Sequence, residues 1–341
     1  MISFACDYLE GCHPAVLEAL TRSNMEQHPG YGLDPWCEKA AAMIRERFSC
    51  PEAAVHFLVG GTQVNAAVIA AALRIYEGVL SAESGHINVH ETGAVEASGH
   101  KILPLPAKDG KITGAQVREA VRRQGDWEHT VRPGMVYVSQ ATETGTVYTR
   151  AELAELRDAC RACGLPLFVD GARLGTALMS PACDIAPEEM ASLCDVFTVG
   201  GTKNGALFGE AAVFASPALA ERFRYVMKQR GAMLAKGRLL GVQFAALMED
   251  DLYCAIARHA VACAMDIRQA LLERGIPLAM DGMTNQLFPI LTEAQCAALG
   301  EDFELEAWET LADGRRVMRI CTSWATAPEA AAALKQRIAA L

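Results

Sequence analysis

The chain has 341 residues, a length typical of about two domains. Hydrophobic residues make up 51% of it and charged residues 21%, which provides enough apolar material for a large buried core. The formal net charge of −10 argues against nucleic acid and anionic membranes as partners, although a local pocket for a small anionic ligand remains compatible with it.

The sequence also bears on location and on metal or redox sites. It has no apolar run of about 18 residues or more, and residues 1–7 lack the basic and apolar regions of a signal peptide, so we expect a soluble, cytoplasmic protein. The 12 cysteines are scattered singly, which is typical of reduced thiols in a core. Cys160 and Cys163 form a C-x-x-C pair, but no second pair stands at zinc spacing, so we predict no metal site.

The first part of the chain alternates helical patterns with short apolar runs. The expected helices cover residues 14–20, 38–48, 65–76, 113–123, 150–163 and 187–193. The expected strands cover residues 55–59, 102–104, 135–139, 167–170 and 196–199. Strands that alternate with helices need crossover connections, so this part predicts an α/β domain whose mostly parallel sheet is covered by helices on both faces.

The pattern changes near residue 250. The expected elements there are helices over 253–273, 293–299 and 328–341 and strand-like runs at 276–278, 286–290 and 317–321. We therefore predict a large α/β domain over residues 1–250 and a smaller α+β domain over 251–341, bridged by the helical region 221–273.

Two residues near strand ends indicate cofactor chemistry. Lys203 follows the apolar run 196–199 in a glycine-flanked loop, where its amine can form a Schiff base. Asp170 closes the run 167–170, where its carboxylate can hold a pyridinium nitrogen. These are the two protein groups that pyridoxal phosphate needs most. Taken alone, a lysine beside glycine is more often a solvated loop residue.

A glycine-rich turn between an expected strand and an apolar helix offers a second part of such a site. Gly60 and Gly61 allow backbone N–H groups to approach an anion, and Thr62 adds a hydroxyl. The turn suits a phosphate monoester, but it lacks the spacing of a P-loop or of a dinucleotide fingerprint. The alternative is a simple helix cap.

Residues 85–91 carry two histidines and an acid, His86, His90 and Glu91. His86 can stack on an aromatic cofactor and can move protons. A metal pair formed by His86 and His90 would need a regular helix, which the glycine and asparagine content of this stretch disfavours. A histidine with a structural role alone is the alternative.

Two arginines are candidates for binding a carboxylate. Arg173 closely follows Asp170, and its planar guanidinium can bind a carboxylate through two hydrogen bonds. Arg319 stands between a polar run and the segment 320–324 of the smaller domain. The alternatives are an ion pair between Arg173 and Asp170, and a solvated Arg319 at a strand end.

In the order of its candidate site residues along the sequence, the chain resembles the low-specificity L-threonine aldolase family, within the β-eliminating lyase group of fold-type-I pyridoxal phosphate enzymes. The matching stretches are Tyr31-Gly-Leu-Asp34, Gly60-Gly-Thr62, His86 to Gly93, Gly145-Thr-Val-Tyr148, Val169-Asp-Gly-Ala-Arg173, Gly201-Thr-Lys-Asn-Gly205 and Arg319. They cover nearly the whole chain, from about residue 5 to about residue 325. The resemblance implies an aspartate-aminotransferase-like fold, with a mostly parallel seven-stranded-type sheet between helices in the large domain and a smaller α+β C-terminal domain.

The resemblance also implies which residues bind the cofactor. Lys203 would carry it, Asp170 would bind its pyridine nitrogen, and His86 would stack on its ring and assist proton transfer. The remaining cofactor-binding positions implied are Gly60, Gly61, Thr62 and Arg173, with Lys236 or Arg238, between which the sequence does not decide, as the basic contact to the phosphate.

The implied substrate contacts include two departures from the family pattern. Arg173 and Arg319 would hold the substrate carboxylate, and Tyr31 would reach the site from a neighbouring subunit, because family members form dimers or tetramers with shared active sites. Cys6 stands where the family has a serine that touches substrate or cofactor. Many members have a histidine after the central strand, whereas the candidates in this chain are Gln140, Thr142 and Glu143.

The expected function is a retro-aldol cleavage of β-hydroxy-α-amino acids, for example of threonine or allo-threonine to glycine and acetaldehyde, on a Schiff base of pyridoxal phosphate. The alternatives are another reaction of this cofactor, such as β-elimination, racemisation or transamination, and a protein that binds the cofactor without turnover. The expected partners are the amino acid substrate and further copies of the chain, with neither nucleic acid nor membrane among them.

Overall fold

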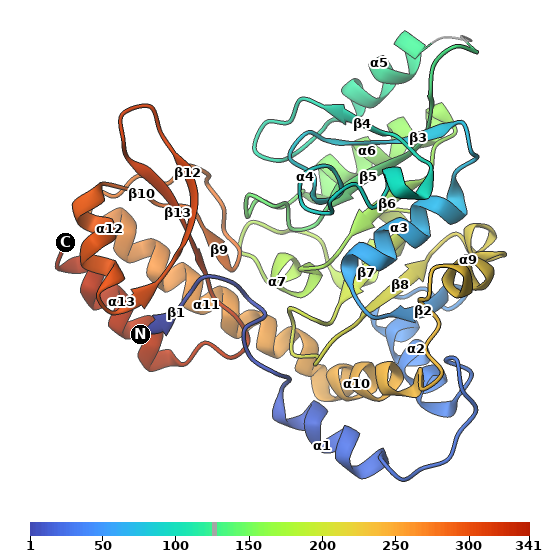
Figure 1. Cartoon of the computed structure of the whole chain (residues 1–341), viewed down its shortest axis with the longest axis horizontal. Helices are drawn as coiled ribbons and strands as arrows, with labels where there is room; N and C mark the ends of the chain where they lie inside the picture. Colours follow the sequence, from blue (N-terminus) through green and yellow to red (C-terminus); the bar gives the residue numbers. More distant parts are fainter. Residues whose placement is uncertain (125–127) are drawn as a thin grey trace.

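The computed structural model describes residues 1–124 and 128–341. A seven-stranded sheet in the order β2-β8-β7-β6-β5-β3-β4 forms the centre of the large domain (Figure 1). Its strands are β2 (Ala54–Leu58), β3 (Glu77–Ala82), β4 (Ile102–Leu105), β5 (Arg132–Ser139), β6 (Leu167–Asp170), β7 (Val196–Gly200) and β8 (Glu210–Phe214). β8 runs antiparallel to both of its neighbours, and the other pairings are parallel, which confirms the mostly parallel sheet.

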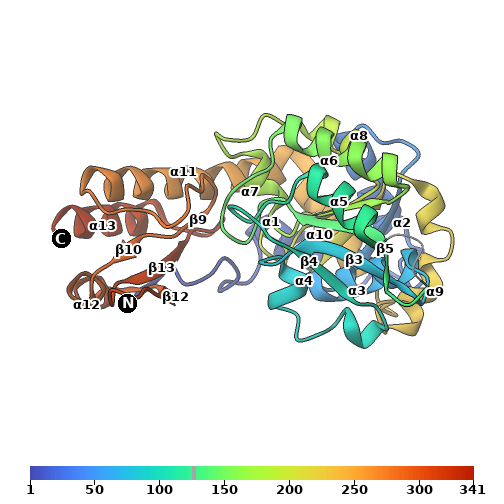
Figure 2. The ribbon, with the colours of Figure 1, turned by 90° about the horizontal axis from the view of Figure 1, so that it is seen from above.

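Helices cover both faces of this sheet, as predicted (Figure 2). One face packs against α1 (Pro14–Ser23), α2 (Pro35–Arg47), α5 (Gly114–Gln124), α6 (Arg150–Cys163) and α10 (Arg238–Met248). The other face packs against α3 (Gly61–Ala72) and α9 (Phe223–Gln229). The inner strands contribute side chains to both cores, which explains why their sequences are continuously apolar.

Several short helices complete the large domain. They are α4 (His86–Val89), α7 (Leu174–Leu178) and α8 (Met190–Leu193), with 3-10 turns at Glu96–Ser98, Pro187–Glu189, Pro217–Ala220 and Glu249–Asp251. The strands β3 and β8 were not predicted. β3 begins with glutamate and glycine, and β8 begins with glutamate and two alanines, so neither has the β-branched or aromatic run that marks a strand.

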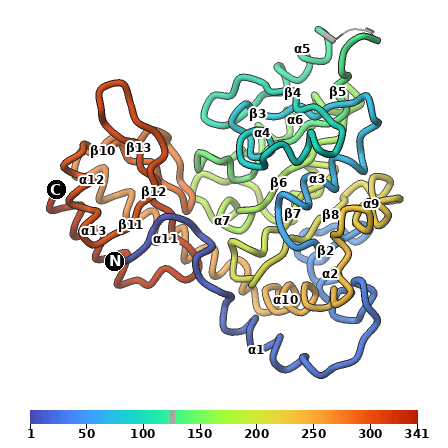
Figure 3. Tube along the Cα trace, in the orientation of Figure 1, coloured from blue at the N-terminus to red at the C-terminus, as the bar shows by residue number. Residues whose placement is uncertain are grey.

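The small domain is built on a long helix, α11 (Leu252–Glu273), that extends from the large domain and carries the C-terminal elements (Figure 3). β13 (Arg316–Cys321) pairs antiparallel with β9 (Gln286–Leu287), β10 (Ile290–Leu291) and β12 (Glu306–Thr310). The helices α12 (Glu293–Gly300) and α13 (Pro328–Ala339) cover this sheet. The result agrees with the predicted smaller α+β arrangement.

Two details differ from prediction. β1 (Ile2–Ser3) pairs in parallel with β11 (Phe303–Glu304), and Phe4 packs into the core of the small domain, so residues 2–4 lie with the small domain although the sequence assigned them to the large one. The run 276–278 forms an isolated bridge from Leu278 to Pro289 rather than a strand. The division at residue 250 itself stays a prediction. Among the described residues, no helix is both long and apolar enough to cross a bilayer.

Candidate active site

A cavity of about 430 Å³ opens at the edge of the large sheet where β2, β5, β6 and β7 end and β8 begins. Its lining brings together most of the residues that the sequence singled out. They are Gly60, Gly61, Thr62, His86, Glu143, Asp170, Arg173 and Lys203. In open α/β sheets ligands bind outside this edge, because strand ends and helix N-termini converge there.

Asp170 ends β6, and its side chain is almost fully buried on the cavity wall. Its Oδ2 accepts hydrogen bonds from Asn65 Nδ2 at 2.8 Å and from the Tyr137 hydroxyl at 2.6 Å. Its Oδ1 accepts from the Ala172 N–H at 2.9 Å. These bonds hold the carboxylate in one orientation. Arg173 pairs with a different acid, so the ion pair between Arg173 and Asp170 that the sequence allowed does not form.

His86 begins α4 and is tied to the same network. Its Nδ1 lies 2.8 Å from Glu91 Oε1, and that oxygen also accepts a hydrogen bond from Asn65 Nδ2 at 2.8 Å. Hydrogen bonds therefore connect His86 through Glu91 and Asn65 to Asp170. A histidine with a structural role alone would have its hydrogen bonds satisfied within the core. Glu91 instead orients the ring of His86 through Nδ1, and His86 lines the cavity.

Lys203 lies in the loop after β7 and lines the cavity. Burial lowers the pKa of its amine and the Arg173 cation lowers it further, while the Asp7 carboxylate acts in the opposite direction. A lower pKa increases the fraction of neutral amine, which is the form that attacks a carbonyl carbon. The surroundings of Lys203 are therefore those of a nucleophile rather than of a solvated loop residue.

The turn at Gly60 leads from β2 into the N-terminus of α3. No side chain caps this helix, and within the described residues the N–H groups of Gly61 and Thr62 have no acceptor. A Cβ atom placed on Gly60 or Gly61 would meet nothing within 4 Å, so both glycines border open space. Unpaired N–H groups and the helix dipole together favour an anion at this position.

Arg173 is held by Asp7, a residue close to the N-terminus. Arg173 Nε donates to Asp7 Oδ2 at 2.7 Å, and Nη2 donates to Oδ1 at 3.0 Å. Burial by itself would raise the pKa of Asp7, but the Arg173 and Lys203 cations, with hydrogen bonds from Arg173 and Asn285, lower it to about 2. The structure records no partner for Arg173 Nη1 among the described residues, so this nitrogen remains available to a ligand.

Arg319 lies on β13 and is not part of the cavity lining. Its Nη2 donates to the Ala5 carbonyl at 2.9 Å and pairs with Glu306, and its guanidinium carbon lies 5.6 Å from the centre of the Trp308 ring. In the part of the chain that the structure describes, its Nε is buried without a partner. Burial lowers the pKa of His90, which lines the cavity, and the charge of Arg319 contributes to this shift. The centre of the Trp308 ring lies 6.1 Å from that of His90, so Arg319 stands at the rim of the cavity and not in open solvent.

In the segment after β5, two of the three candidate side chains pair within a turn. Gln140 is fully buried, its Oε1 accepts from the Tyr148 N–H at 2.8 Å, and its Nε2 donates to the Tyr148 carbonyl at 3.0 Å. Thr142 is buried too, and its hydroxyl bonds to those of Thr144 and Thr146. Neither side chain lines the cavity, because the polar groups of both pair within the turn. The structure therefore does not bring Gln140 and Thr142 into this cavity, and their predicted substrate contacts stay untested.

Glu143, the third candidate in this segment, does line the cavity. Its Oε1 accepts hydrogen bonds from the His86 N–H at 3.0 Å and from Ser139 Oγ at 2.6 Å. Burial raises the pKa of its carboxyl group. Both recorded bonds use Oε1, which leaves Oε2 for a ligand.

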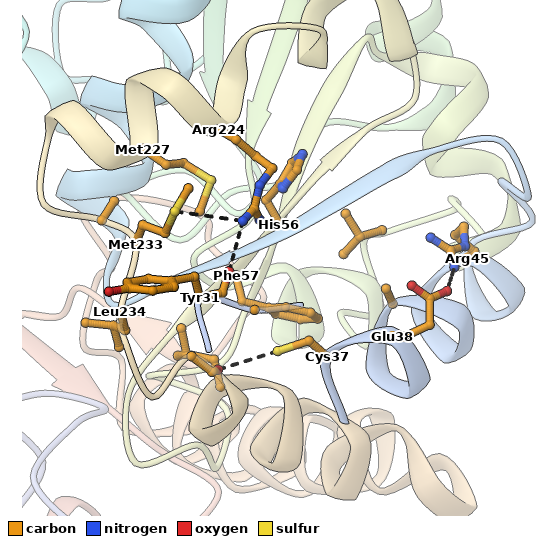
Figure 4. A pocket seen from close by; sticks show the side chains of 16 residues that line it. Tyr31, Cys37, Glu38, Arg45, His56, Phe57, Arg224, Met227, Met233 and Leu234 are labelled. Atoms are coloured by element: carbon orange, nitrogen blue, oxygen red, sulfur yellow. Dashed lines mark hydrogen bonds and ion pairs between the residues drawn. The ribbon is translucent and has the colours of Figure 1, made fainter. Parts of the chain in front are cut away.

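Tyr31 lines a second, smaller cavity of about 90 Å³, where it lies beside α9 and the segment leading to α10 (Figure 4). Arg224 Nη2 donates to the Tyr31 carbonyl at 3.1 Å, and Lys228 Nζ lies 4.6 Å from the centre of the Tyr31 ring. Tyr31 has a left-handed φ of 62° and is 44% exposed. It does not line the larger cavity of its own chain.

Three other predicted residues also lie outside the larger cavity. Lys236 is exposed, and the Arg238 guanidinium donates to the carbonyls of Ser23 and Asn24 at 2.7 and 3.0 Å. Within one chain, therefore, neither basic residue borders the turn at Gly60. Cys6 is half-buried beside the lining residue Tyr8 rather than part of the lining itself.

Glu210 lines the cavity although the sequence did not single it out. It is 4% exposed, and its Oε2 accepts a hydrogen bond from the Gly201 N–H at 3.1 Å. Burial raises its pKa to about 7, although Thr202 and Lys203 favour the ionised form. An acid that opens a buried strand is a usable signal, but the strand β8 was itself missed.

Comparisons with known proteins agree with this geometry. The model of the beta-eliminating lyase family matches residues 4–294. The low specificity L-threonine aldolase of Pseudomonas aeruginosa is 33% identical over 299 residues, covering 87% of this chain and 86% of its own, and that of Escherichia coli K12 is 28% identical, covering 94% and 93%.

Solved structures extend the comparison. The threonine aldolase of Leishmania major superimposes with a TM-score of 0.97 at 44% identity, covering 99% of this chain and 98% of its own. An aspartate aminotransferase of Thermus thermophilus gives a TM-score of 0.73 at 14% identity, covering 100% and 91%, which confirms the aspartate-aminotransferase-like fold. From the family match and the identity to its relatives, the chain belongs to the beta-eliminating lyase family.

Proposed function

We propose that this protein is a pyridoxal phosphate-dependent aldolase that cleaves L-threonine or L-allo-threonine to glycine and acetaldehyde. The observation that carries the proposal is the convergence of Lys203, Asp170 and Arg173 on one cavity. The similarity of the chain to the threonine aldolases of Pseudomonas aeruginosa and Leishmania major favours this reaction over the other reactions of the family.

The residues present fit the cofactor. Its phosphate matches the open space and unpaired N–H groups at Gly60, Gly61 and Thr62. Lys203 offers the amine for a Schiff base, and Asp170 offers a fixed carboxylate for the pyridine nitrogen. The cavity volume of about 430 Å³ falls within the range of small-molecule sites, roughly 300–1,000 Å³. When bound, the cofactor supplies a ring that accepts the electrons of a broken Cα bond.

Arg173 and Arg319 bind the substrate carboxylate in this proposal. Each is anchored by an acid, Asp7 and Glu306 respectively, and each retains a guanidinium nitrogen without a partner among the described residues. When two arginines hold the carboxylate, they fix the rotation about the bond between the amine nitrogen and Cα of the substrate. The rotation selects which bond at Cα is aligned for cleavage, and this orientation supplies part of the rate acceleration.

Glu143 is the base for the β-hydroxyl in this proposal. Oε1 is held by the His86 N–H and by Ser139, so Oε2 is positioned to take the hydroxyl proton. Burial raises the pKa of Glu143 towards the working pH, which makes the carboxylate a stronger base than an exposed glutamate.

The proposed assembly is a homo-oligomer with shared sites. Tyr31, Lys236 and Arg238 lie away from the cavity of their own chain, which supports a role in the site of a neighbouring subunit. Exposed apolar side chains near the N-terminus supply surface for such a contact, and they include Tyr8, Leu9, Leu17, Met25 and Leu33. The cytoplasmic location that the sequence predicts is supported by the twelve cysteines without a disulfide.

The test is the Lys203→Ala variant, with Lys39→Ala as a matched control because Lys39 is exposed and pairs with Glu249. We expect Lys203→Ala to lose the visible absorbance of bound cofactor and the release of glycine and acetaldehyde, while Lys39→Ala retains both. Retention of both by Lys203→Ala would refute the assignment.

A product assay on the wild type separates the aldolase from an eliminating enzyme and from a binder without turnover. Glycine with acetaldehyde supports the aldolase. Pyruvate or 2-oxobutyrate with ammonia would instead indicate elimination, and an unchanged absorbance spectrum on addition of threonine would indicate a binder without turnover.

A further inference from the structure

Glu210 occupies an unusual place in the sheet. It is the first residue of β8, which runs antiparallel to its two neighbours in the seven-stranded sheet. Its backbone pairs with Leu58 at the end of β2 on one side and with Gly200 at the end of β7 on the other. β2 leads directly into the phosphate turn at Gly60, and β7 leads directly into the loop of Lys203. Glu210 therefore lies between the two parts of the site.

Glu210 forms part of the wall of the cavity that these parts share. It lines the cavity together with Gly61, Thr202 and Lys203. It is 4% exposed, and its recorded backbone bond, from the Gly201 N–H at 3.1 Å, uses Oε2. An acid so enclosed has little water with which to compensate a change of charge nearby.

The charges that face Glu210 come from several elements. Lys203, in the loop after β7, favours the ionised carboxylate, while Asp170, at the end of β6, disfavours it. Tyr253, on α11, also lies within electrostatic range. Burial outweighs the attraction of Lys203, so the pKa of Glu210 rises to about 7 and the group is part protonated near neutral pH.

We propose that Glu210 takes up a proton when an anion binds at the turn formed by Gly60, Gly61 and Thr62, so that binding of the phosphate group is coupled to the charge of this carboxyl. The inference rests on the proposed function in one respect only, because it takes this turn to be the phosphate site.

The physical reason is repulsion across the cavity. A doubly negative group at the N-terminus of α3 stands on the same sheet edge as Glu210, in surroundings where water screens poorly. Ionised Glu210 would weaken the binding of the anion, and neutral Glu210 would not. By linkage, the anion then binds more tightly at a pH where Glu210 is already protonated, and at neutral pH its binding draws a proton from solvent.

This coupling gives Glu210 a role as a positioning residue. It holds the Gly201 amide of the lysine loop in either protonation state, because a neutral carboxyl still has an acceptor oxygen. Its proton offsets part of the charge that the phosphate group brings in. A glutamine at this place would keep an acceptor oxygen for the Gly201 N–H but would carry no proton that titrates.

Titration calorimetry of the cofactor-free protein with sulfate tests the proposal, because sulfate stays doubly negative across the pH range used. Measured in two buffers of different ionisation enthalpy near pH 7.5, wild-type binding is expected to take up protons. Glu210→Gln, which keeps an oxygen for the Gly201 N–H, is expected to reduce the uptake at least about twofold. Its sulfate affinity is also expected to fall less between pH 6 and pH 8.5 than that of the wild type.

Glu143→Gln is the matched control, because Glu143 is also a buried carboxyl of the cavity but lies after β5, away from the phosphate turn. It should keep the wild-type uptake. Equal uptake in the wild type and in Glu210→Gln would overturn the proposal, as would a loss of uptake in Glu143→Gln as large as that in Glu210→Gln.

If Glu210→Gln does not fold, infrared difference spectra of the wild type give a second measurement. Sulfate binding at pH 7.5 should increase the band of a protonated carboxyl group, and an unchanged band would overturn the proposal. Failure of the proposed function is seen separately, as absence of glycine release from threonine by the wild-type holoenzyme.

Discussion

The two ends of the proposed substrate site are built differently. On the sheet side, Asp170 receives hydrogen bonds on both carboxylate oxygens from Asn65, Tyr137 and Ala172. On the side of the small domain, Arg319 has a buried Nε without a partner in the described chain. The first group is fully oriented before any ligand binds, whereas the second leaves a hydrogen bond to be made.

The difference follows from the packing of the two regions. The sheet is buried between two helical layers and its inner strands have almost no exposed side chains, so polar groups at its edge are fixed by rigid neighbours. β12, which carries Glu306 and Trp308, is largely exposed. We infer that the sheet side sets the chemistry, and that the rim mainly sets affinity.

The largest effect is expected at the sheet side. Asp170→Asn should lower kcat by roughly 10³-fold, because an amide cannot hold a protonated pyridine nitrogen as a carboxylate does. Steady-state cleavage of threonine measures it. Tyr137→Phe removes a single bond to Asp170 and should cost much less. A loss for Asp170→Asn of less than about tenfold would contradict the division between chemistry and affinity.

Glu143→Gln tests the wall beside His86. The glutamine can keep the two bonds made by Oε1, so the variant removes mainly the basic oxygen. We expect kcat to fall by roughly 10²-fold with a smaller change in KM. Burial raises the pKa of Glu143, so wild-type activity should fall on the acid side at a pH above the ordinary glutamate range, and the variant should lose this acid limb. An unchanged pH profile would assign the base elsewhere.

Glu210→Gln sharpens the comparison through stability. The pKa of Glu210 is raised from 4.5 to about 7 on folding, so the folded state binds the proton more tightly and wild-type stability falls as pH rises through this window. The variant has no titrating group at this position, so its free energy of unfolding does not fall for this reason as pH rises. Its free energy of unfolding relative to the wild type should therefore improve by about 2–3 kcal/mol from pH 5 to pH 8. Urea denaturation of the cofactor-free proteins measures it, and a constant difference would show that Glu210 does not titrate in this range.

The smallest effect is expected at the rim. Arg319→Gln should raise KM for threonine by about tenfold, with a smaller change in kcat, because it removes one charged contact to the substrate carboxylate. Arg316→Gln, on the exposed start of the same strand, is the control and should leave both constants unchanged. A fall in kcat as large as that of Asp170→Asn would mean that the rim contributes to the chemistry itself.

Two of the strands that the sequence predicted correctly are buried on both faces. Residues 167–170 and 196–199 are continuously apolar because both sides pack against helices, so they were recognisable without a partner strand. β8 escaped because alanines and a glutamate carry no strand signal on their own, and its place in the sheet comes from pairing with β2 and β7.

The candidate site divides in the same way. Lys203 and Asp170 stand at the ends of readable strands, so the sequence could assign them to one edge of a parallel sheet. The segment from Gln140 to Glu143 could not be resolved, because its turn decides which side chain faces the cavity. The Gln140 side chain bonds to the backbone of Tyr148 and does not reach the cavity, whereas Glu143 lines the cavity.

The sequence by itself determined the alternation of strands and helices, the glycine turn before α3, and the lysine and aspartate that indicate the cofactor. Only the tertiary structure decided the partners. It paired Arg173 with Asp7, joined His86 to Asp170 through Glu91 and Asn65, and inserted Glu210 between the phosphate turn and the lysine loop. The physical reason is that residue type and local pattern fix which chemistry a side chain can do, whereas burial and neighbouring charge, which come from residues distant in sequence, fix its orientation and protonation.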